Sequence, residues 1–302
     1  MHSSGSSGTT DRLDLFTTHR SLLFTVAYEM LGSAADAEDV VQEAWLRWAG
    51  LDAGARAEVR DPRAYFVRIV TRQALNRLRT LSRRREEYVG EWLPEPLLTV
   101  PDVAEDIELA ENVSIAMLTV LESLTPVERA VFVLREVFDA PYEEIAQAVD
   151  KSTAAVRQIG SRARSHVAAR RPRMQVDRSE QQAVVERFLS AVTTGDVQGL
   201  MDVLAPDVVL VADGGGIALA ARVPVYGVKK VINLLRPFPQ WAVNPKVALL
   251  WLNGGLGIRI DDEAGGPSLI SVVVEDGRIA RIFAMRNPDK LGRVDEETRL
   301  AR

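Results

Sequence analysis

The segment Tyr142-Glu-Glu-Ile-Ala-Gln-Ala-Val-Asp-Lys-Ser-Thr-Ala-Ala-Val-Arg-Gln-Ile159 contains the clearest structural pattern in this chain. It predicts a short helix in which Ile145 and Val149 face inward, then a polar break, then a second helix. In that second helix Val156 and Ile159 face the core. Two helices with this spacing are typical of a helix-turn-helix.

The helix before this motif has a well-marked start. Thr125-Pro-Val-Glu128 is a capping box, with proline at the first helical position and glutamate at the third. Apolar residues follow at helical spacing, as far as Phe138. Two residues depart from the usual motif. Asp150 occupies the turn where glycine is common, and Gly160 lies inside the last helix at a cost of about 1 kcal/mol relative to alanine.

The charge of the last helix indicates what it contacts. From Lys151 to Val176 the chain carries seven lysines and arginines and no acidic residue. Such a helix and tail fit a row of phosphates on nucleic acid. A basic helix that only faces solvent is the alternative.

Composition limits the class of protein. A chain of 302 residues should contain two or three domains. No window is apolar enough for a membrane span, and no secretory signal is present, so we expect a cytosolic protein. Cysteine is absent and the three histidines are scattered, so we expect no disulfide, no metal site and no cofactor. A net charge of −5 discourages indiscriminate DNA binding but leaves room for local basic faces.

Two amphipathic helices are predicted near the N-terminus. Residues 1–10 are rich in serine and glycine and look like an artificial linker. A first helix at 12–31 ends at Gly32, and a second runs from Asp36 to Trp48. The polar face of the second helix, which alone indicates only contact with solvent, carries Asp36, Asp39, Gln42 and Glu43.

An arginine-rich helix begins at Asp61-Pro62, which supply its cap and first position. From Arg60 to Arg85 there are nine arginines and one acidic residue, with aromatic and amide side chains between them. This mixture suits melting DNA, because arginines hold phosphates while flat side chains meet displaced bases. The candidate DNA contacts are Arg68, Arg72, Asn76, Arg79 and Arg83.

Together these three segments resemble the extracytoplasmic-function (ECF) sigma factors, small bacterial initiation factors that contain the second and fourth conserved sigma domains. The resemblance covers roughly residues 12–170, and the three motifs in this order are far more specific than any one alone. It implies an all-α region 2 domain at 11–86, a linker at 87–112 and an all-α region 4 domain at 113–174. The implied partners are core RNA polymerase and promoter DNA.

The resemblance also implies roles for individual residues. In the family, the helix that matches Asp36 to Trp48 docks on the clamp helices of the polymerase β′ subunit, so its polar face becomes a candidate polymerase contact. The arginine-rich helix would read and open the minus-ten element. The last helix of the helix-turn-helix would enter the major groove of the minus-thirty-five element. There Ser152, Thr153, Arg157 and Gln158 can reach base edges, while Arg162 and Arg164 contact phosphate.

The charge changes sign in the predicted linker. From Glu86 to Glu128 there is no lysine or arginine, and Pro94, Pro96 and Pro101 predict that the middle of this stretch is extended. The segment is either a solvated tether or an acidic strand that lies in a basic polymerase channel or covers the basic sigma surfaces. Within it, Trp92-Leu-Pro94-Glu-Pro96 suggests an apolar anchor. This motif resembles the linker signature of ECF sigma factors with a fused SnoaL-like domain.

Residues 179–302 predict a separate α+β domain. Two helices come first, then strands near 208–212 and before 223, a helix from Val225 to Leu235, and four further strands. Asp276-Gly277 predicts a tight hairpin between the last two. The order resembles the cone of the SnoaL and ketosteroid isomerase superfamily.

Two motifs of this domain match signatures of the same sigma subgroup. They are Asp213-Gly214-Gly215-Gly216, which permits tight backbone geometry, and Asn287-Pro288-Asp289-Lys290-Leu291. Both can be plain turns that end strands. By the resemblance we expect them, with Trp92, Pro94 and Pro96, to form an interdomain contact that regulates the sigma domains.

Three other functions remain open from the sequence. The cone can be an enzyme, for which Asp202, Asp207, Asp213 and Tyr226 are available without a recognisable acid/base pair. It can be a receptor for an apolar ligand, with a cavity lined by Phe238, Trp241, Trp251 and Phe283. The chain can also be a DNA-binding repressor that works without polymerase, although a repressor has no use for the first two helical motifs. We expect a sigma factor that is not itself an enzyme.

Overall fold

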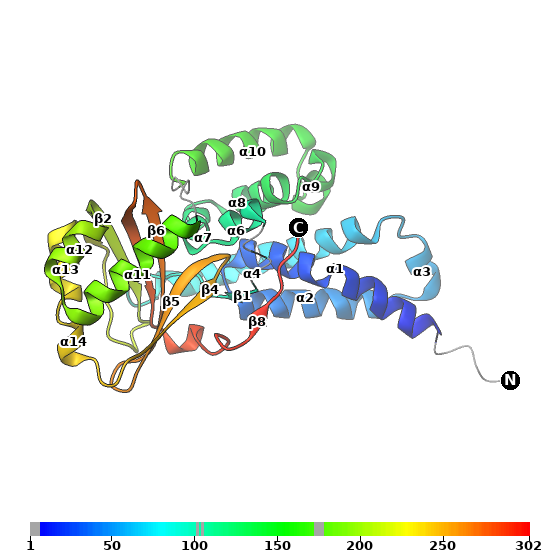
Figure 1. Ribbon diagram of the computed structural model, residues 1–302. Helices are drawn as coiled ribbons and strands as arrows, with labels where there is room; N and C mark the ends of the chain where they lie inside the picture. Colours follow the sequence, from blue (N-terminus) through cyan, green and yellow to red (C-terminus); the bar gives the residue numbers. More distant parts are fainter. Residues whose placement is uncertain (1–6, 101–102, 104–105, 172–177) are drawn as a thin grey trace. The chain divides into compact units, whose positions relative to one another are not determined.

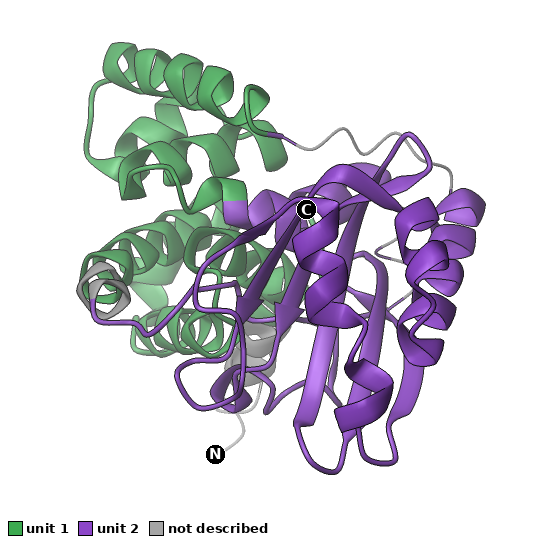
Figure 2. Cartoon of the chain, turned by 90° about the vertical axis from the view of Figure 1, so that its left-hand side faces the viewer, with its two compact units in different colours: residues 1–83, 120–170, 299–302 green, residues 84–119, 171–298 purple. Residues whose placement is uncertain are grey.

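The computed structural model describes residues 7–100, 103, 106–171 and 178–302, except for the side chains of 7–14 and 82–86. The chain forms two compact units (Figure 1 and Figure 2). The first contains residues 1–83, 120–170 and 299–302, and the second contains 84–119 and 171–298. Within the described ranges, every helix is too short or too polar to cross a lipid bilayer.

Four helices open the first unit: α1 (Ser7–Leu31), α2 (Ala34–Ala49), α3 (Ala53–Ala57) and α4 (Pro62–Glu86). Ser33 caps α2, because its hydroxyl accepts a hydrogen bond from the Asp36 N–H at 3.2 Å. The ring of Phe66 lies at the centre of the helices, 5.3 Å from the ring of Phe16 and 5.0 Å from that of Trp48. The three long helices predicted from the sequence are confirmed.

The helix-turn-helix is also confirmed. It comprises α8 (Pro126–Phe132), the π-helix η1 (Val133–Val137), α9 (Tyr142–Val149) and α10 (Thr153–Ala168). Thr125 and Glu128 form the predicted capping box. Asp150 takes the left-handed conformation, with φ of +55°. At Gly160 a Cβ would lie 3.4 Å from the Val131 side chain, which is van der Waals contact, so α10 packs directly on α8 there.

The helix that starts at Pro126 differs from its prediction in one respect. The sequence predicts one regular helix as far as Phe138, whereas the turns widen to π type from Val133. Val133, Leu134 and Val137 of this segment are all buried.

An ionisable pair is buried where α1 meets α8. Arg129 is 2% exposed and donates from Nε to the Glu29 carbonyl at 2.8 Å and from Nη1 to the Glu122 carboxylate at 2.6 Å. Glu29 has no exposed surface, and its carboxyl oxygens have no hydrogen-bond partner among the described residues. Burial raises the pKa of Glu29 to about 8, although Arg129 acts in the opposite direction.

The last residues of the chain belong to the first unit. The Ala301 N–H donates to the Thr25 hydroxyl oxygen at 3.1 Å. Thr25 is fully buried in α1, and its hydroxyl in turn donates to the Ser21 carbonyl at 2.8 Å. The tail therefore helps to satisfy a polar group inside the helical unit.

The second unit is built on an eight-stranded sheet of order β3-β2-β7-β6-β5-β4-β1-β8. Its strands are β1 (Leu98–Thr99), β2 (Leu204–Asp213), β3 (Val225–Tyr226), β4 (Lys246–Leu252), β5 (Gly255–Asp262), β6 (Gly266–Glu275), β7 (Arg278–Met285) and β8 (Glu297–Thr298). Neighbours are antiparallel except β2 with β7 and β1 with β8. The predicted hairpin turn is confirmed, because Asp276 and Gly277 both have positive φ, at 49° and 71°.

Four helices pack on one face of this sheet (Figure 1). They are α11 (Arg178–Thr194), α12 (Val197–Val203), α13 (Val228–Leu235) and α14 (Phe238–Trp241). A second apolar core on the other side includes Leu93, Ile115, Phe283 and Met285. The predicted fold class, two helical sigma-type domains and an α+β domain, is confirmed. The strand predicted before Val223 is wrong, since only Val225–Tyr226 pairs there, and the next helix starts at Val228 after Gly227.

The predicted linker belongs largely to the second unit. It contributes β1 to the sheet and α6 (Ile107–Val113), and Leu93 and Leu97 are buried at 1% and 3% exposure. Leu97 N–H donates to the Asn253 side chain at 2.9 Å, and Asn253 donates to the Val113 carbonyl at 2.8 Å. The part around Pro94 and Pro96 has no helix, as these prolines predict, whereas Pro101 lies outside the described residues. This part of the linker is fixed to the sheet rather than surrounded by solvent.

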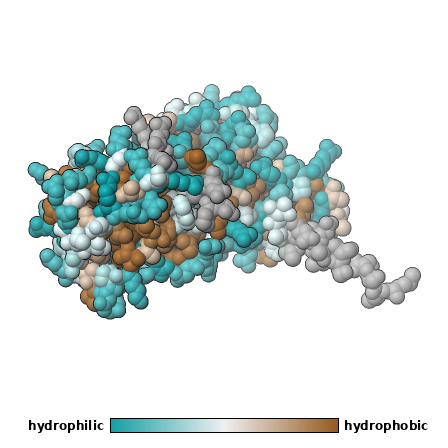
Figure 3. Space-filling model, in the orientation of Figure 1, coloured by the Kyte–Doolittle hydropathy of each residue, from teal (hydrophilic) through white to brown (hydrophobic). Residues whose placement is uncertain are grey.

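Hydrophobic surface gathers over β4 and β5 of the second unit (Figure 3). Leu249 of β4 is 38% exposed, and Trp251 is half-buried beneath the guanidinium of Arg178, 5.8 Å from the ring centre. The strands thus leave part of their outer face uncovered by the helices.

The pKa of Glu29 predicts how stability depends on pH. Its pKa is raised in the folded state, so the carboxyl stays protonated there, and the associated stability is lost as pH rises from about 4.5 through about 8. We therefore expect the stability of the protein relative to Glu29→Gln to fall by at most about 1.4 kcal/mol per pH unit across that window. Thermal unfolding of both proteins at pH 5, 6, 7 and 8 checks this. Parallel pH profiles would show that Glu29 does not titrate in this range.

Candidate functional site

The start of α10 presents the predicted base-reading residues. Ser152 caps the helix, since its hydroxyl accepts a hydrogen bond from the Ala155 N–H at 3.3 Å, and Thr153 is the first helical residue. Arg157 and Gln158 are exposed one turn later. Arg157 lies 3.4 Å from the Glu143 carboxylate and 5.5 Å from the centre of the Tyr142 ring, so α9 holds its guanidinium.

The two predicted phosphate contacts lie further along the same helix. Arg162 and Arg164 are both exposed on α10. The Glu136 carboxylate accepts two hydrogen bonds from Arg164, at 2.7 Å and 3.0 Å, and this contact raises the pKa of the guanidinium. Arg164 therefore stays charged, in a fixed orientation on the outside of the motif.

The basic stripe of α4 lies close to the helix-turn-helix. Arg72 donates to the Gln147 carbonyl at 2.8 Å, and Arg68 donates to the Gln147 side chain at 3.3 Å. Asn76 and Arg79 are exposed, and Arg79 donates to the Asn76 side chain at 2.8 Å. Arg83 is part of α4, but its side chain lies outside the described residues. The predicted minus-ten contacts thus share one side of the helix, and two of them touch α9.

The predicted polymerase face of α2 is partly anchored. Arg77 of α4 lies 2.6 Å from the Asp36 carboxylate and 2.5 Å from that of Asp39. The hydrogen bond that Arg77 donates to Asp36 is the main cause that raises the pKa of Arg77. Gln42 and Glu43 are exposed. Asp36 and Asp39 both help to hold α2 against α4, although Asp39 is exposed too.

One residue of this face was missed by the sequence analysis. Leu46 is 60% exposed and follows Asp39 by seven positions, so it lies on the same side of α2. The signal was present in the sequence, because a leucine on the polar side of an amphipathic helix breaks the pattern.

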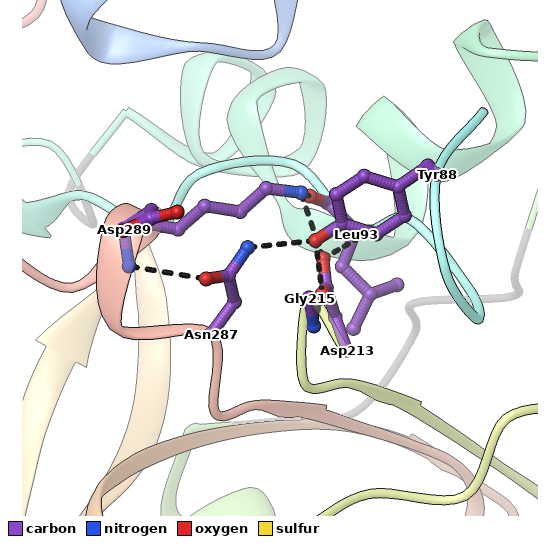
Figure 4. A network of polar contacts seen from close by, with 7 residues as sticks. Tyr88, Leu93, Asp213, Gly215, Asn287 and Asp289 are labelled. Atoms are coloured by element: carbon purple, nitrogen blue, oxygen red, sulfur yellow. Dashed lines mark hydrogen bonds and ion pairs between the residues drawn. The ribbon is translucent and has the colours of Figure 1, made fainter. Parts of the chain in front are cut away.

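The third set of predicted residues gathers around the buried carboxylate of Asp213 (Figure 4). Asp213 ends β2 and has no exposed surface. One oxygen accepts from the Tyr88 hydroxyl at 2.5 Å and the Gly215 N–H at 3.1 Å. The other accepts from the Leu93 N–H at 2.9 Å and from Lys290 at 2.7 Å. We call this set of contacts the linker latch, since it joins the linker to the sheet.

The two sequence motifs of the C-terminal region meet at the latch. The Asn287 amide donates to the Tyr88 hydroxyl at 2.7 Å, and its oxygen accepts from the Asp289 N–H at 3.0 Å (Figure 4). Gly215 has φ of +62°, and a Cβ there would lie 2.5 Å from the Asn287 side chain. At Gly214 a Cβ would lie 2.3 Å from the Ala218 carbonyl oxygen, so the bend admits no larger residue. Pro288 opens the short helix η2 (Pro288–Lys290).

The tryptophan motif of the linker completes the latch. The Lys290 ammonium lies 3.9 Å from the centre of the Trp92 ring and 4.9 Å from that of Tyr88, and it donates to the Leu93 carbonyl at 2.6 Å. Pro94 and Pro96 are buried beside it. Burial and the Asp213 contact raise the pKa of Tyr88, so its phenol remains a hydrogen-bond donor.

Tyr88 and Lys290 are the members of the latch that sequence reasoning did not select. Lys290 stands inside a quoted motif, and a lone lysine beside a buried aspartate is the partner that such a carboxylate requires. Nothing local distinguishes Tyr88 from other linker residues.

The side chains considered for catalysis do not converge. Asp202 and Asp207 are exposed, Tyr226 is 62% exposed, and Asp213 is taken up by the latch. Among the described residues, no three His, Asp or Glu side chains are grouped closely enough to hold a metal ion. Of the four aromatic residues considered for a cavity, Phe238 and Trp241 line one, whereas Phe283 lies in the opposite core.

Two family models match the helical segments of the chain. Residues 15–84 match the model of Sigma-70 region 2, and residues 114–167 match that of Sigma-70, region 4. The chain is 36% identical to the ECF RNA polymerase sigma factor SigJ of Mycobacterium tuberculosis over 290 residues, which cover 91% of each chain. It is 28% identical over 287 residues to the probable ECF RNA polymerase sigma factor SigI of the same species.

A solved structure agrees over nearly the whole length. The crystal structure of the Mycobacterium tuberculosis ECF sigma factor SigJ superimposes with a TM-score of 0.74 and 33% sequence identity. The match covers 93% of this chain and 99% of that one, so it includes the sheet-containing unit as well as the helical one. From its two sigma regions and this similarity over both units, the chain belongs to the ECF RNA polymerase sigma factors.

Proposed function

We propose that this sigma factor engages core polymerase through α2, reads two promoter elements through α4 and α10, and is regulated by its second unit through the linker. The observation that carries the proposal is that one helical unit has three exposed faces. The face of α2 is acidic and includes an apolar residue, and the faces of α4 and α10 are basic. A repressor that acts without polymerase needs only the last of them. The cytoplasm is the compartment in which this function would operate.

The face of α2 has the character of a docking surface. Asp39, Gln42, Glu43 and Leu46 occupy one side of the helix, at positions that recur every three to four residues. All four are exposed, and an exposed leucine among acidic and amide groups fits a partner with basic residues around an apolar spot. By the family resemblance this partner is the pair of clamp helices of the polymerase β′ subunit.

The two DNA-reading segments would have to separate before both can bind a promoter. Elements centred roughly 25 base pairs apart are separated by about 85 Å of duplex, at about 3.4 Å per base pair. In the first unit, Arg68 and Arg72 of α4 contact Gln147 of α9 directly. We infer that these contacts belong to a resting form, and that polymerase binding to α2 accompanies their release.

The linker latch supports a regulatory role for the second unit. The linker connects α4 to the helix-turn-helix, so its fixation to the sheet limits how far those two segments can move apart. The alternative, a DNA-binding regulator with an enzymatic cone, is disfavoured because the carboxylates available for catalysis do not share a pocket. We therefore propose a non-enzymatic regulatory unit.

Leu46→Lys tests the polymerase contact. The side chain is exposed, so the helix should fold normally, whereas a charge at the centre of the surface should weaken binding to bacterial core polymerase at least about tenfold. Met201→Lys is the matched control, since Met201 is 46% exposed on α12. Binding is measured by fluorescence anisotropy of labelled full-length protein. Equal affinities for both variants would rule out this face.

Substitutions in α10 test how the minus-thirty-five element is read. Gln158→Ala should change base preference at one position of that element, at a cost of about 1–3 kcal/mol for the preferred base. Arg162→Ala should instead weaken all promoters about equally. Run-off transcription from a promoter library with the full chain distinguishes the two effects. Identical profiles for the two variants would contradict the assignment.

Tyr88→Phe and Asp213→Asn test the latch. Loss of one hydrogen bond to a carboxylate should destabilise the second unit by about 2 kcal/mol, and loss of the buried charge by about 3–5 kcal/mol. Asp207→Asn, on the exposed side of the same strand, is the control and should have little effect. Denaturant unfolding measures stability. Promoter initiation at saturating polymerase should change for Tyr88→Phe, and unchanged initiation would show that the latch is structural only.

A further inference from the structure

A cavity lies between the sheet of the second unit and the helices that cover it. Its volume is about 330 Å³, within the range of pockets that hold small molecules. The walls are almost entirely apolar and come from α11, α13, α14 and from strands β2, β5, β6 and β7, with Phe188, Leu210, Ile258 and Ile282 among them. Neither the polymerase face nor the DNA faces described above include any part of it.

One end of the cavity carries a balanced pair of charges. Arg286 is half-buried and donates to the Ser268 hydroxyl at 3.1 Å and to the carbonyls of Leu219 at 2.5 Å and Gly265 at 3.0 Å. These bonds use three of the five guanidinium N–H groups. Asp262 lies nearby, and its carboxylate accepts from backbone N–H groups, including that of Val243 at 2.7 Å.

This pair determines which polar group a ligand can present. Burial alone would raise the pKa of Asp262, but its backbone hydrogen bonds and Arg286 lower it, so the carboxylate stays ionised. A ligand anion would meet that negative charge, and a ligand cation would meet Arg286. A neutral oxygen can accept a hydrogen bond from one of the remaining N–H groups of Arg286. Such a group is repelled neither by the Asp262 carboxylate nor by the Arg286 guanidinium.

The mouth of the cavity is apolar and exposed. Leu219 is 85% exposed, Trp241 46% and Leu234 43%, and all three line the cavity. Large apolar side chains at the rim of an apolar cavity are unusual on a surface that contacts only water. They would instead cover the outer part of a bound apolar molecule.

The loop after β2 joins this cavity to the linker latch. Leu219, Ala220 and Ala221 line the cavity. The same loop begins with Asp213, which binds Tyr88 and Leu93 of the linker. At Gly216 a Cβ would lie 3.1 Å from the Val89 side chain, so the loop also packs directly on the linker.

We propose that the cavity binds a small, largely apolar molecule with one neutral hydrogen-bond acceptor, such as a ketone, and that binding strengthens the linker latch. The acceptor oxygen meets Arg286, and the apolar body fills the space between the helices and the sheet. The occupied cavity fixes the loop from Asp213 to Ala221 and thereby the linker segment 88–93. The regulatory consequence rests on the proposed function, whereas the binding site does not.

A neutral fluorophore tests the site. The probe N-phenyl-1-naphthylamine is titrated into the full chain and should give a saturable rise in fluorescence. Ala284→Phe, which fills the cavity, should weaken binding at least about tenfold, whereas Ala183→Phe at an exposed position of α11 should leave it unchanged. Equal binding by the two variants, with both folded by circular dichroism, would overturn the proposal.

Displacement of the probe tests the ligand class. Three molecules with the same aromatic body are compared: 2-acetylnaphthalene, 2-naphthoate and naphthalene. We expect 2-acetylnaphthalene to displace the probe at concentrations about tenfold lower than either of the others. Preference for the carboxylate or for the bare hydrocarbon would contradict the role given to Arg286 and Asp262.

Hydrogen exchange tests the connection to the linker. With 2-acetylnaphthalene bound, the amides of residues 88–93 should exchange several-fold more slowly, and the effect should vanish in Ala284→Phe. Binding without this protection would overturn the coupling to the latch. These measurements use neither polymerase nor DNA, so their failure is distinct from failure of the proposed function, which the initiation assay decides.

Discussion

A carboxylate without exposed surface is stable only when charge and hydrogen bonds surround it. Asp213 meets this condition with partners from three separated parts of the sequence: the linker, its own glycine bend and the segment after the last long strand. The penalty for leaving this carboxylate unpaired is large, so its contacts tie the three parts to one another. The linker of this sigma factor is part of the folded second unit, where the latch, the hydrogen bond from Leu97 to Asn253 and the pairing of β1 hold it.

In the first unit, part of the proposed DNA-binding surface already contacts another helix of the same unit. The arginines of α4 have the spacing that suits DNA, yet two of them contact α9. The buried Glu29 and Arg129 lie where α1 meets α8, and neither gains full hydrogen bonding among the described residues. Burial of such groups costs desolvation, so both would be better hydrated if α1 and α8 separated, as the proposed release of α4 from α9 would allow.

Much of this arrangement could be predicted from the sequence, because local rules determine it. Capping residues, helical spacing and the charge of each face were sufficient for α2, α4 and the helix-turn-helix, and the glycine bend and the Asn-Pro motif marked the latch. Tyr88 and Lys290 were missed for a different reason. Their roles come from burial and from partners up to 199 positions away, which periodicity does not reveal. The π-helix after Phe132 likewise has no signal in any single residue of the sequence. Leu46 was missed although the pattern of α2 contains its signal.

The route of the chain through its two units has a consequence for synthesis. The first unit takes residues from three separate segments, and its final segment is 299–302, where Ala301 binds the hydroxyl of Thr25. The linker strand β1 likewise pairs with β8, almost two hundred positions later. During translation the contacts of Thr25 and of β1 therefore form only after residues 297–301 have been made. A chain stopped after the helix-turn-helix would lack Asp213, β4 and β8, so it would contain the linker without the residues that hold it.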